Sequence, residues 1–150
     1  MVCAWSLLGK LLDQSGWEEA LIEANITSSG RVNSIINSSH LKRTRYAHEV
    51  SFLVFNMLMQ EAFLDCEEDC TFEEWRSQQC GSFPTFFFWD MILRIQKLIF
   101  MLVRSFRQRN FDLYVSCLEK IAPLCFALDA TNYSRWLPTH IRDMKSLPTQ

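Results

Sequence analysis

The stretch that decides the fold runs from Phe83 to Asn110 and reads FPTFFFWDMILRIQKLIFMLVRSFRQRN. It contains no glycine, and Pro84 near its start is its only proline. At 100° per residue, a single narrow band collects most of its polar side chains and one methionine, namely Asp90, Arg94, Lys97, Met101, Arg104, Ser105 and Gln108. Nearly everything else is apolar. Such a helix needs several partner helices to cover its other faces, so we expect it at the centre of a bundle.

The composition of the whole chain also favours an all-α protein. Hydrophobic residues make up 49% of the 150 residues and charged residues 21%, which is typical of a globular protein. Four glycines and four prolines leave little material for the many turns of an all-β fold. We therefore predict a single all-α domain over residues 1–150, an irregular bundle of six to eight helices around a central apolar helix at about residues 84–108.

The other expected helices follow from apolar spacing at three and four residues, and they cover about residues 2–14, 17–24, 31–38, 40–64, 72–81 and 111–128. The helix over 40–64 has the apolar positions Leu41, Tyr46, Ala47, Val50, Leu53, Val54, Met57, Leu58 and Ala62. The helix over 111–128 is expected to bury Phe111, Tyr114, Val115, Leu118, Ile121, Ala122 and Cys125.

Several residues predict where helices begin or bend. Ser15 to Glu18 and Thr71 to Glu74 have the spacing of capping boxes. Pro84 suits a first helical position, and Asn110 suits an N-cap. Pro123 should kink its helix. Near the C-terminus, Asp129 or Thr131 is expected to cap one short helix, and Pro138 to begin another.

The net charge of −2 hides a separation of acids from bases. Residues 94–109 carry five bases and no acid. Residues 61–74 carry no base and seven carboxylates, namely Glu61, Asp65, Glu67, Glu68, Asp69, Glu73 and Glu74. The chain should thus have an acidic end and a basic stripe. An acidic linker is the commoner reason for such a run, so we do not take it as an active site.

A basic turn opens the helix that starts near His40, with Lys42, Arg43 and Arg45 in its first positions. The helix dipole disfavours positive charge at that end, so local stability does not explain the placement. The turn either meets an acidic partner or phosphate, or it is a solvated face paired with nearby carboxylates. The second reading is the commoner one, because three bases without a groove or aromatic platform are a weak nucleic-acid signal.

The cysteines give no strong metal signal, because the six of them include no Cys-x-x-Cys pair. Cys66, Cys70 and Cys80 form the only cluster and could take a metal ion, but reduced thiols of an intracellular protein are the commoner reading. Cys3 stands alone, and Cys117 and Cys125 fall on an apolar helical pattern. No cofactor is expected.

Two further features have both a functional and a structural reading. Tyr133 and Trp136 could form a base-stacking platform, but such a pair is more often buried packing. His140 and Asp143 could form an acid–base set, but at i and i+3 a paired surface histidine or a satisfied core histidine is commoner.

Nothing in the chain predicts export or membrane insertion. The first residues, MVCAWSLLGKLL, lack a basic start, and Lys10 interrupts the apolar run. Asp90, Arg94 and Lys97 break the central helix before it reaches the length of a membrane span. We therefore expect no transmembrane span and an intracellular protein of the nucleus or cytoplasm.

The C-terminal stretch ALDATNYSRWLPTHIRDM, residues 127–144, is the most distinctive. It resembles the signature ALD-x-T-N-Y-A-R-W-L-P-V-H-L-R-D-M of a large family of transposon-derived proteins that is multicopy in animal genomes. Three upstream stretches resemble further segments of that family in the same order, namely SGWEEALIEANITSSG (15–30), SSHLKRTRYAHEV (38–50) and LVRSFRQRNFDLY (102–114). The chain departs from the family pattern at Glu49, Ser134 and Thr139, which suggests drift.

The resemblance implies a part of a larger protein. Longer relatives look like transposases whose ribonuclease-H-like core is interrupted by a helical region, and this chain resembles that helical region only. In them a later segment D-x-x-x-E-Q-x-N supplies an acidic residue, and other acids lie upstream. Two-metal strand cleavage needs such carboxylates, and they are expected to be absent here. We therefore expect no enzyme activity.

The expected function is that of a non-catalytic helical remnant with weak nucleic-acid or protein binding. The alternatives are a protein–protein interaction module, self-associating or not, that uses exposed apolar surface, and a membrane-associated helical protein. No small-molecule substrate is expected. The bases expected to meet nucleic acid are Lys42, Arg43, Arg45, Arg94, Lys97, Arg104, Arg107, Arg109, Arg135, Arg142 and Lys145.

Overall fold

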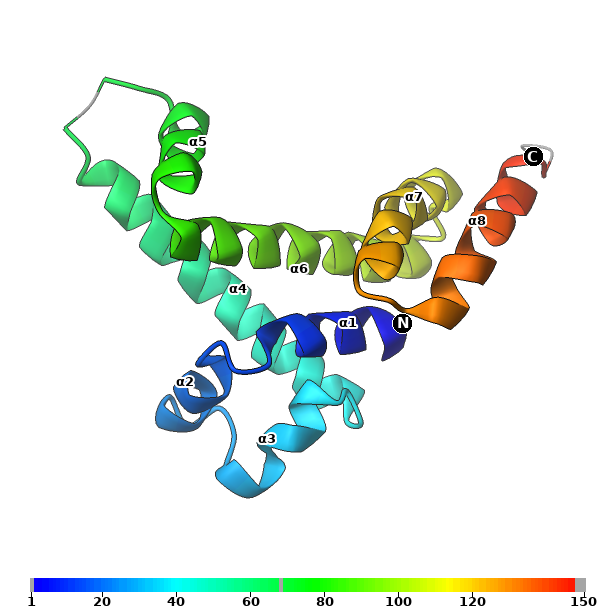
Figure 1. Cartoon of the computed structure of the whole chain (residues 1–150), viewed down its shortest axis with the longest axis horizontal. Coiled ribbons are helices and arrows are strands. Elements are labelled where there is room, and N and C mark those ends of the chain that lie inside the picture. Colours follow the sequence, from blue (N-terminus) through cyan, green and yellow to red (C-terminus); the bar gives the residue numbers. More distant parts are fainter. Residues whose placement is uncertain (1, 68, 148–150) are drawn as a thin grey trace. The chain divides into compact units, whose positions relative to one another are not determined.

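The computed structural model describes residues 2–67 and 69–147, with side chains from Ala4 onward. Over these residues it is all-helical, with no strand (Figure 1). Eight helices follow one another along the described chain, namely α1 (Val2–Leu12), α2 (Trp17–Glu23), α3 (Ser29–Ile36), α4 (Leu41–Leu64), α5 (Phe72–Ser82), α6 (Pro84–Gln108), α7 (Phe111–Ala127) and α8 (Thr131–Lys145). The prediction of an all-α fold with six to eight helices is confirmed.

The chain divides into two compact units. One unit comprises residues 8–96, which include α2 to α5 and the first half of α6. The other comprises residues 1–7 and 97–150, which include α7, α8 and the second half of α6. The expectation of a single domain over 1–150 stays a prediction.

Three of the predicted helix starts are confirmed. α6 begins at Pro84. α5 begins with a capping box, in which the Thr71 amide donates to the Glu74 carboxylate over 2.8 Å and the Glu74 amide donates to the Thr71 hydroxyl over 3.3 Å. The bond from the Thr71 amide, followed by that from its hydroxyl, lowers the pKa of Glu74. At α7, Asn110 Oδ1 accepts from the Leu113 amide over 2.9 Å.

The capping box predicted for Ser15 and Glu18 is wrong. The N-cap of α2 is Gly16, in the left-handed conformation with φ of +82°, and it has no side-chain cap bond. The Ser15 hydroxyl lies one residue too early. It donates to the Leu12 carbonyl over 2.7 Å and accepts from the Trp17 amide over 3.3 Å. It therefore closes the end of α1, and the turn needs glycine at the next position.

The expectation of two helices near the C-terminus is also wrong, because α8 runs without a break through Pro138. Neither Asp129 nor Thr131 is its N-cap, a position held by Ala130 without a side-chain bond. Proline inside a helix costs about 3 kcal/mol through its missing amide bond and its clash with the preceding turn. The neighbouring Leu137 is buried in the core shared with α7, and this packing offsets the cost.

The polar band of α6 differs from its prediction in two positions. Arg94, Lys97, Arg104 and Gln108 are exposed as expected, and Met101 is half-buried. Asp90 and Ser105, however, are buried. Asp90 is only 5% exposed because it forms ion pairs with Arg76 of α5 and with Arg94. The Ser105 hydroxyl donates to the Leu102 carbonyl over 2.6 Å, so its polar group is satisfied within the helix.

In the unit of residues 8–96, an aromatic core holds α5 against α4 and α6. Met59, Trp75 and Leu93 form its buried part. Trp75 lies edge-on to Phe86 at 5.6 Å between ring centroids, and the Phe63 ring packs against Trp75 at the same spacing. These contacts fix the last turns of α4 by side chains from three helices.

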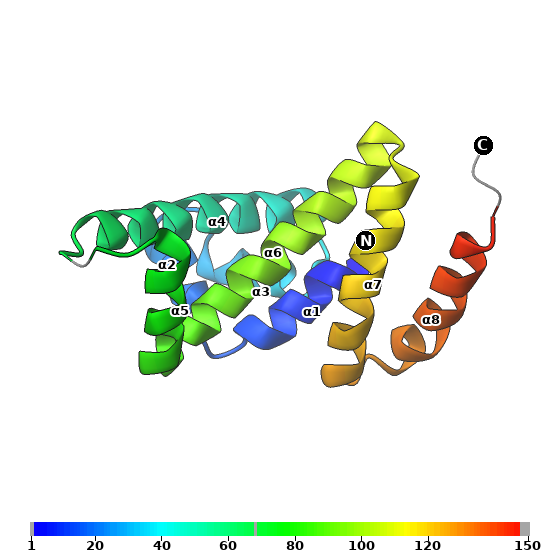
Figure 2. The ribbon, with the colours of Figure 1, turned by 90° about the horizontal axis from the view of Figure 1, so that it is seen from above.

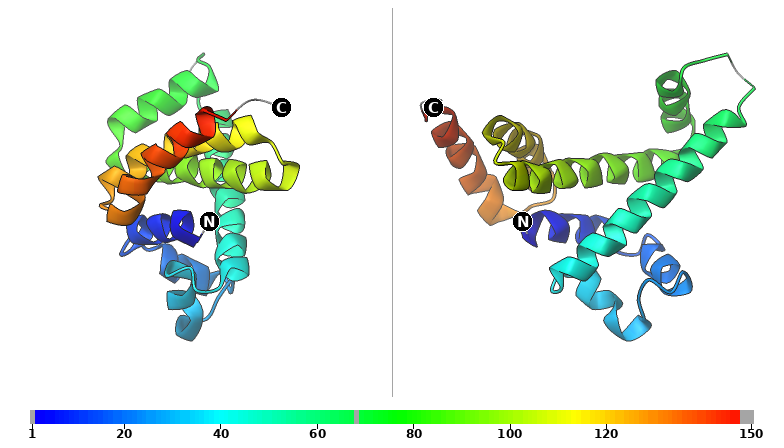
Figure 3. Two further views of the ribbon diagram at one scale, coloured as in Figure 1. Left: turned by 90° about the vertical axis from the view of Figure 1, so that its right-hand side faces the viewer. Right: turned by 180° about the vertical axis from the view of Figure 1, so that it is seen from behind.

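At the other end of the same unit, α2 and α3 form a short pair beside the first turns of α4 (Figure 3). Leu8, Leu12, Trp17, Val32 and Ile35 are buried there. The backbone of α1 approaches α3 so closely that a Cβ atom on Gly9 would lie 2.1 Å from the Ile36 carbonyl oxygen. Only glycine fits at this crossing.

In the unit of residues 1–7 and 97–150, α7 and α8 run in opposite directions side by side (Figure 2). Their shared core contains Leu7, Leu102, Cys117, Leu118, Ile121, Ala122, Cys125 and Leu137. Pro123 lies inside α7. Two side chains predicted to be buried are not, because Phe111 is exposed and Tyr114 is half-buried. Phe111 is the first residue of α7, where the helix has only begun to meet its neighbours.

Candidate functional site

Helix α4 reverses the usual amphipathic pattern, because it has polar side chains on its buried face and apolar side chains on its exposed face. The face that packs inward carries Thr44, His48 and Ser51, all of them buried. The opposite face is apolar and exposed, and its members Tyr46, Leu53, Val54 and Met57 are each between 47% and 61% exposed. We call these four residues the outer face of α4. Exposed apolar groups in a continuous stripe are informative, unlike a single exposed leucine.

The buried polar groups of α4 each have a specific partner. The Thr44 hydroxyl donates to the Ile35 carbonyl over 3.1 Å. The Ser51 hydroxyl donates to the Ala47 carbonyl over 2.8 Å and accepts from the Trp17 indole N–H over 2.8 Å. Because these bonds satisfy groups that are costly to bury alone, they hold this side of α4 inward.

His48 is the third buried polar group and is 1% exposed. Its ring stacks on Trp17 at 4.7 Å between centroids, and the Gln96 side-chain amide donates to its Nδ1 over 3.0 Å. Burial lowers the pKa of His48 to about 3, so the ring is neutral at physiological pH. A ring enclosed in this way contributes to the structure of α4 and is not open to a substrate.

The two ends of α4 carry opposite charge. Lys42 and Arg43 are exposed in its first turn. Arg45 is half-buried, and its Nε donates to Glu49 over 2.7 Å, so only this base follows the reading of a face paired with nearby carboxylates. At the acidic end, Glu61 of α4 is exposed, as are Asp65, Glu67 and Asp69 in the loop that follows and Glu73 and Glu74 in the first turn of α5, while Glu68 lies outside the described residues. Helix α4 therefore runs from a basic end to an acidic end.

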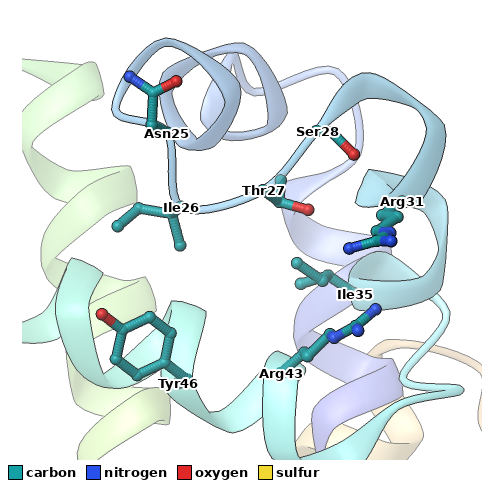
Figure 4. Close-up of a pocket in the computed structure, with 8 residues that line it drawn as sticks. All are labelled: Asn25, Ile26, Thr27, Ser28, Arg31, Ile35, Arg43 and Tyr46. Atoms are coloured by element: carbon teal, nitrogen blue, oxygen red, sulfur yellow. The ribbon is translucent and has the colours of Figure 1, made fainter.

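A cavity of about 370 Å³ lies at the basic end of α4 (Figure 4). Its lining residues come from the loop before α3, from α3 and from α4, namely Asn25, Ile26, Thr27, Ser28, Arg31, Ile35, Arg43 and Tyr46. Figure 4 shows the side chains of Arg31 and Arg43 on the same side of the cavity, next to Ile35. Among the residues described, no carboxylate lies within ion-pair distance of either guanidinium. The cavity is therefore suited to a negatively charged group.

The other predicted nucleic-acid contacts are spread over both units. Lys42, Arg43, Arg45 and Arg94 belong to the unit of residues 8–96, and the remaining seven belong to the other unit. Three of the eight bases outside α4 form ion pairs, namely Arg94 with Asp90, Arg142 with Asp143, and Lys145 with Glu119. The Arg104 Nε donates to Gln108 over 3.0 Å. Lys97, Arg107, Arg109 and Arg135 are exposed.

The cysteine cluster predicted as an optional metal site does not gather in space. In residues 2–67 and 69–147, no group of three histidine, cysteine, aspartate or glutamate side chains is placed to hold a metal ion. Cys80 instead lies beside Asp90, and burial, followed by the nearby carboxylate, raises its thiol pKa. A thiol held protonated is a poor metal ligand and nucleophile. The side chain of Cys3 lies outside the described residues.

The aromatic pair near the C-terminus is exposed, so its expected burial is wrong. Tyr133 is 41% and Trp136 is 57% exposed. Trp136 stacks on His140 at 4.5 Å, and the Tyr114 hydroxyl lies 2.9 Å from His140 Nε2. Asp143 pairs with Arg142. His140 is thus a half-buried histidine with a packing role. The two exposed rings border an apolar cavity of about 210 Å³ that also touches Leu102 and Leu118.

No helix of the described chain combines the length and the apolar character that crossing a bilayer requires. Comparisons of the chain with models of protein families, with curated proteins and with solved structures found no match.

Sequence reasoning identified the apolar positions of α4 but not that most of them are exposed. The signal was present in the spacing of Thr44, His48 and Ser51, which follow one another at four and three residues. A second, polar stripe with helical spacing opposite the apolar one means that only one of the two can face the core.

Proposed function

We propose that this chain is a non-catalytic helical binding module that acts by protein contact, with the outer face of α4 as its docking surface. One observation carries the proposal, namely the exposed apolar stripe on a helix of 24 residues whose buried side carries Thr44, His48 and Ser51. Contiguous exposed apolar surface on a globular protein is typical of an interaction site.

The size of the hydrophobic effect supports a partner on this face. Burying a leucine, valine or methionine side chain that is otherwise exposed stabilises a complex by roughly 1.5–3 kcal/mol. At 100° per residue, Leu53, Val54 and Met57 lie within about 100° of one another on adjacent turns, so one partner helix can cover all of them at once. No comparable apolar stripe is exposed on the described part of α6, where exposed positions in the second half are mainly Lys97, Arg104, Arg107 and Gln108.

We further propose that the module is a remnant of the helical portion of a transposon-derived protein and that it works inside the cell. The support is the resemblance of four stretches in the same order, the last of which contains nearly the whole of α8. On this proposal the residues that would hold paired metal ions belong to other parts of the larger protein. Plasmid incubated with the chain and Mg²⁺ or Mn²⁺ should show no more nicking than a blank.

A photoreactive amino acid at position 57 tests the docking surface directly. In cells expressing this variant, irradiation should give a covalent adduct heavier than one chain. The matched control places the same group at Ala62, which is exposed on α4 but lies outside the outer face. It should give little adduct. Equal labelling at both positions, or none at position 57, would show that the outer face does not dock protein.

Nucleic-acid binding remains the second candidate, favoured by four exposed bases outside α4, namely Lys97, Arg107, Arg109 and Arg135. Each phosphate contact makes binding weaker as salt rises. Retention of the chain on a random duplex should therefore fall steeply between about 50 and 200 mM salt. Retention that is insensitive to salt, or absent at the lower concentration, would eliminate this candidate.

A further inference from the structure

We propose that the partner on the outer face of α4 is a second copy of this chain, with the two α4 helices antiparallel about a two-fold axis that passes between Leu53 and Val54. This inference rests on the proposed function and names its partner. It follows from three observations on α4, namely the symmetry of its apolar stripe, the opposite charge of its ends, and the cavity at its basic end.

The apolar stripe is suited to pairing with itself. A two-fold interface brings the same patch of both subunits together, so the patch must be complementary to its own reversed copy. With the axis between Leu53 and Val54, Val50 lies level with Met57 of the second copy. Tyr46 lies level with the aliphatic part of Glu61. The centre of the interface is then wholly apolar, and polar groups lie only at its ends, which is the usual arrangement of a protein interface.

The charges of α4 select the antiparallel direction. In this register Arg43 lies level with Leu64 of the second copy, and therefore within a turn of that copy's Glu61 and Asp65. Arg43 and Glu61 are 18 residues apart, which is five helical turns, so both lie on the same edge of the stripe. A two-fold axis perpendicular to both helices places the same edge of the stripe of each copy side by side, so Arg43 of one copy lies next to the acidic residues of the other. A parallel pair would instead place Arg43 beside its own copy.

The cavity at the basic end gives these carboxylates a place to bind. Arg31 and Arg43 both border it, and among the described side chains neither has a carboxylate within ion-pair distance. Two guanidinium groups that border one cavity repel each other, and an anion between or beside them offsets this repulsion. In the symmetric pair, the acidic end of each copy supplies this negative charge to the cavity of the other copy.

Other occupants fit the same face less well. A membrane with anionic lipids would attract Lys42 and Arg43 but repel the six described carboxylates at the acidic end. Nucleic acid would be repelled in the same way. An antiparallel copy places opposite charge at both ends of the helix, and its apolar stripe has the same length as the stripe that it covers.

Size-exclusion chromatography with light scattering on the full chain tests the proposal. At about 100 μM the expected mass is twice the 17.7 kDa of one chain. Met57→Glu places a charge in the apolar stripe and should give only the single-chain mass. Ala62→Glu adds the same charge to the same helix outside the outer face and should leave the dimer intact. Circular dichroism should show equal helix content in both variants.

Charge exchange tests the direction of pairing. Arg43→Glu should weaken dimerisation about tenfold, because it places acids beside acids at both ends. Combining Arg43→Glu with Glu61→Arg and Asp65→Arg reverses both members of each contact and should restore the affinity. If the triple variant is as weak as Arg43→Glu, the antiparallel register is wrong.

A wild-type chain that keeps its single-chain mass at about 0.5 mM would overturn the second-copy proposal outright. The photoreactive group at position 57 separates this failure from that of the docking surface. An adduct with a different protein would leave the proposed function standing without the dimer, whereas an absence of adduct would overturn both.

Discussion

Lowering the pH should destabilise the unit that contains His48, and the effect can be worked out from its pKa. The ring is 1% exposed, and its pKa is lowered to about 3, whereas an unfolded histidine has a pKa of about 6.5. The folded state therefore remains neutral where the unfolded state already binds a proton. Stability is fully present above pH 6.5 and is lost progressively as the pH falls towards 3.

The magnitude at pH 5 follows from the proton binding of the two states. The unfolded ring is stabilised by protonation across the 1.5 units between pH 6.5 and 5, and the folded ring is still almost wholly neutral. With about 1.36 kcal/mol per unit, the free energy of unfolding falls by about 2 kcal/mol between pH 7.5 and 5. Continued acidification towards pH 3 would raise the loss to about 4 to 5 kcal/mol.

Urea unfolding at pH 7.5 and 5.0, followed by tryptophan fluorescence, measures this loss. Trp17 stacks on His48 and therefore reports on the same part of the molecule. For a denaturant slope of about 2 kcal/mol per M, the midpoint should fall by about 1 M. His48→Gln removes the titrating group, so its midpoints should differ by about 1 M less between the two pH values than those of the wild type. If both proteins lose the same stability on acidification, the assignment of the effect to His48 is wrong.

Three further predictions concern stability at pH 7.5, each measured as a shift of the urea midpoint. Asp90→Asn removes the buried carboxylate that pairs with the half-buried guanidinium of Arg76 and should cost about 3 kcal/mol, whereas Glu73→Gln, at a mostly exposed ion pair, should cost under about 0.5 kcal/mol. Equal losses would contradict the buried pair. Gly9→Ala should destabilise by more than about 2 kcal/mol, because its Cβ would lie 2.1 Å from a backbone oxygen of α3, while Gly30→Ala, with open space around it, should be neutral or stabilise by up to about 1 kcal/mol. A tolerated Gly9→Ala would mean that α1 does not cross α3 this closely. Asn110→Ala should cost about 1 kcal/mol through the lost cap of α7, and Asn110→Ser should recover most of it; an alanine variant as stable as the wild type would show that the cap is dispensable.

The fold class and several helix ends could be predicted because their signals are local. The apolar stretch before Asn110 has the period of a helix over its whole length. Proline is favoured at the first position of a helix, which is where Pro84 lies. The cap at Asn110 needs only the next three residues. In each of these cases the deciding contact lies within one turn of the residue that predicts it.

The predictions for Asp90 and Pro138 were wrong because residues distant in sequence determine the structure at these positions. Asp90 looked like a surface acid because its neighbours in sequence do not show Arg76, which lies 14 residues earlier and pairs with it in the fold. Pro138 looked like a helix start because its local cost is plain, while the compensating burial of Leu137 depends on α7. Local propensity gives way to tertiary packing at such positions.

The candidate site was predicted only in part for the same reason. The exposure of Arg43 could be predicted from its charge, and the structure adds that Arg31 borders the same cavity. Spacing alone identified the apolar stripe that contains Leu53 and Met57, but not whether other helices of the chain cover it. That depends on which side of α4 the indole of Trp17 and the amide of Gln96 reach, and neither contact can be read from the sequence.

The two hydroxyl groups and the imidazole on the inner side of α4 also oppose rotation of the helix about its own axis. If the helix rolled about its axis to hide Leu53 and Met57, Thr44, His48 and Ser51 would each lose a bond to another helix that only the present orientation provides. An all-apolar inner side would permit such a rotation, since one apolar surface can replace another in the core. The buried polar groups therefore keep the outer face of α4 exposed.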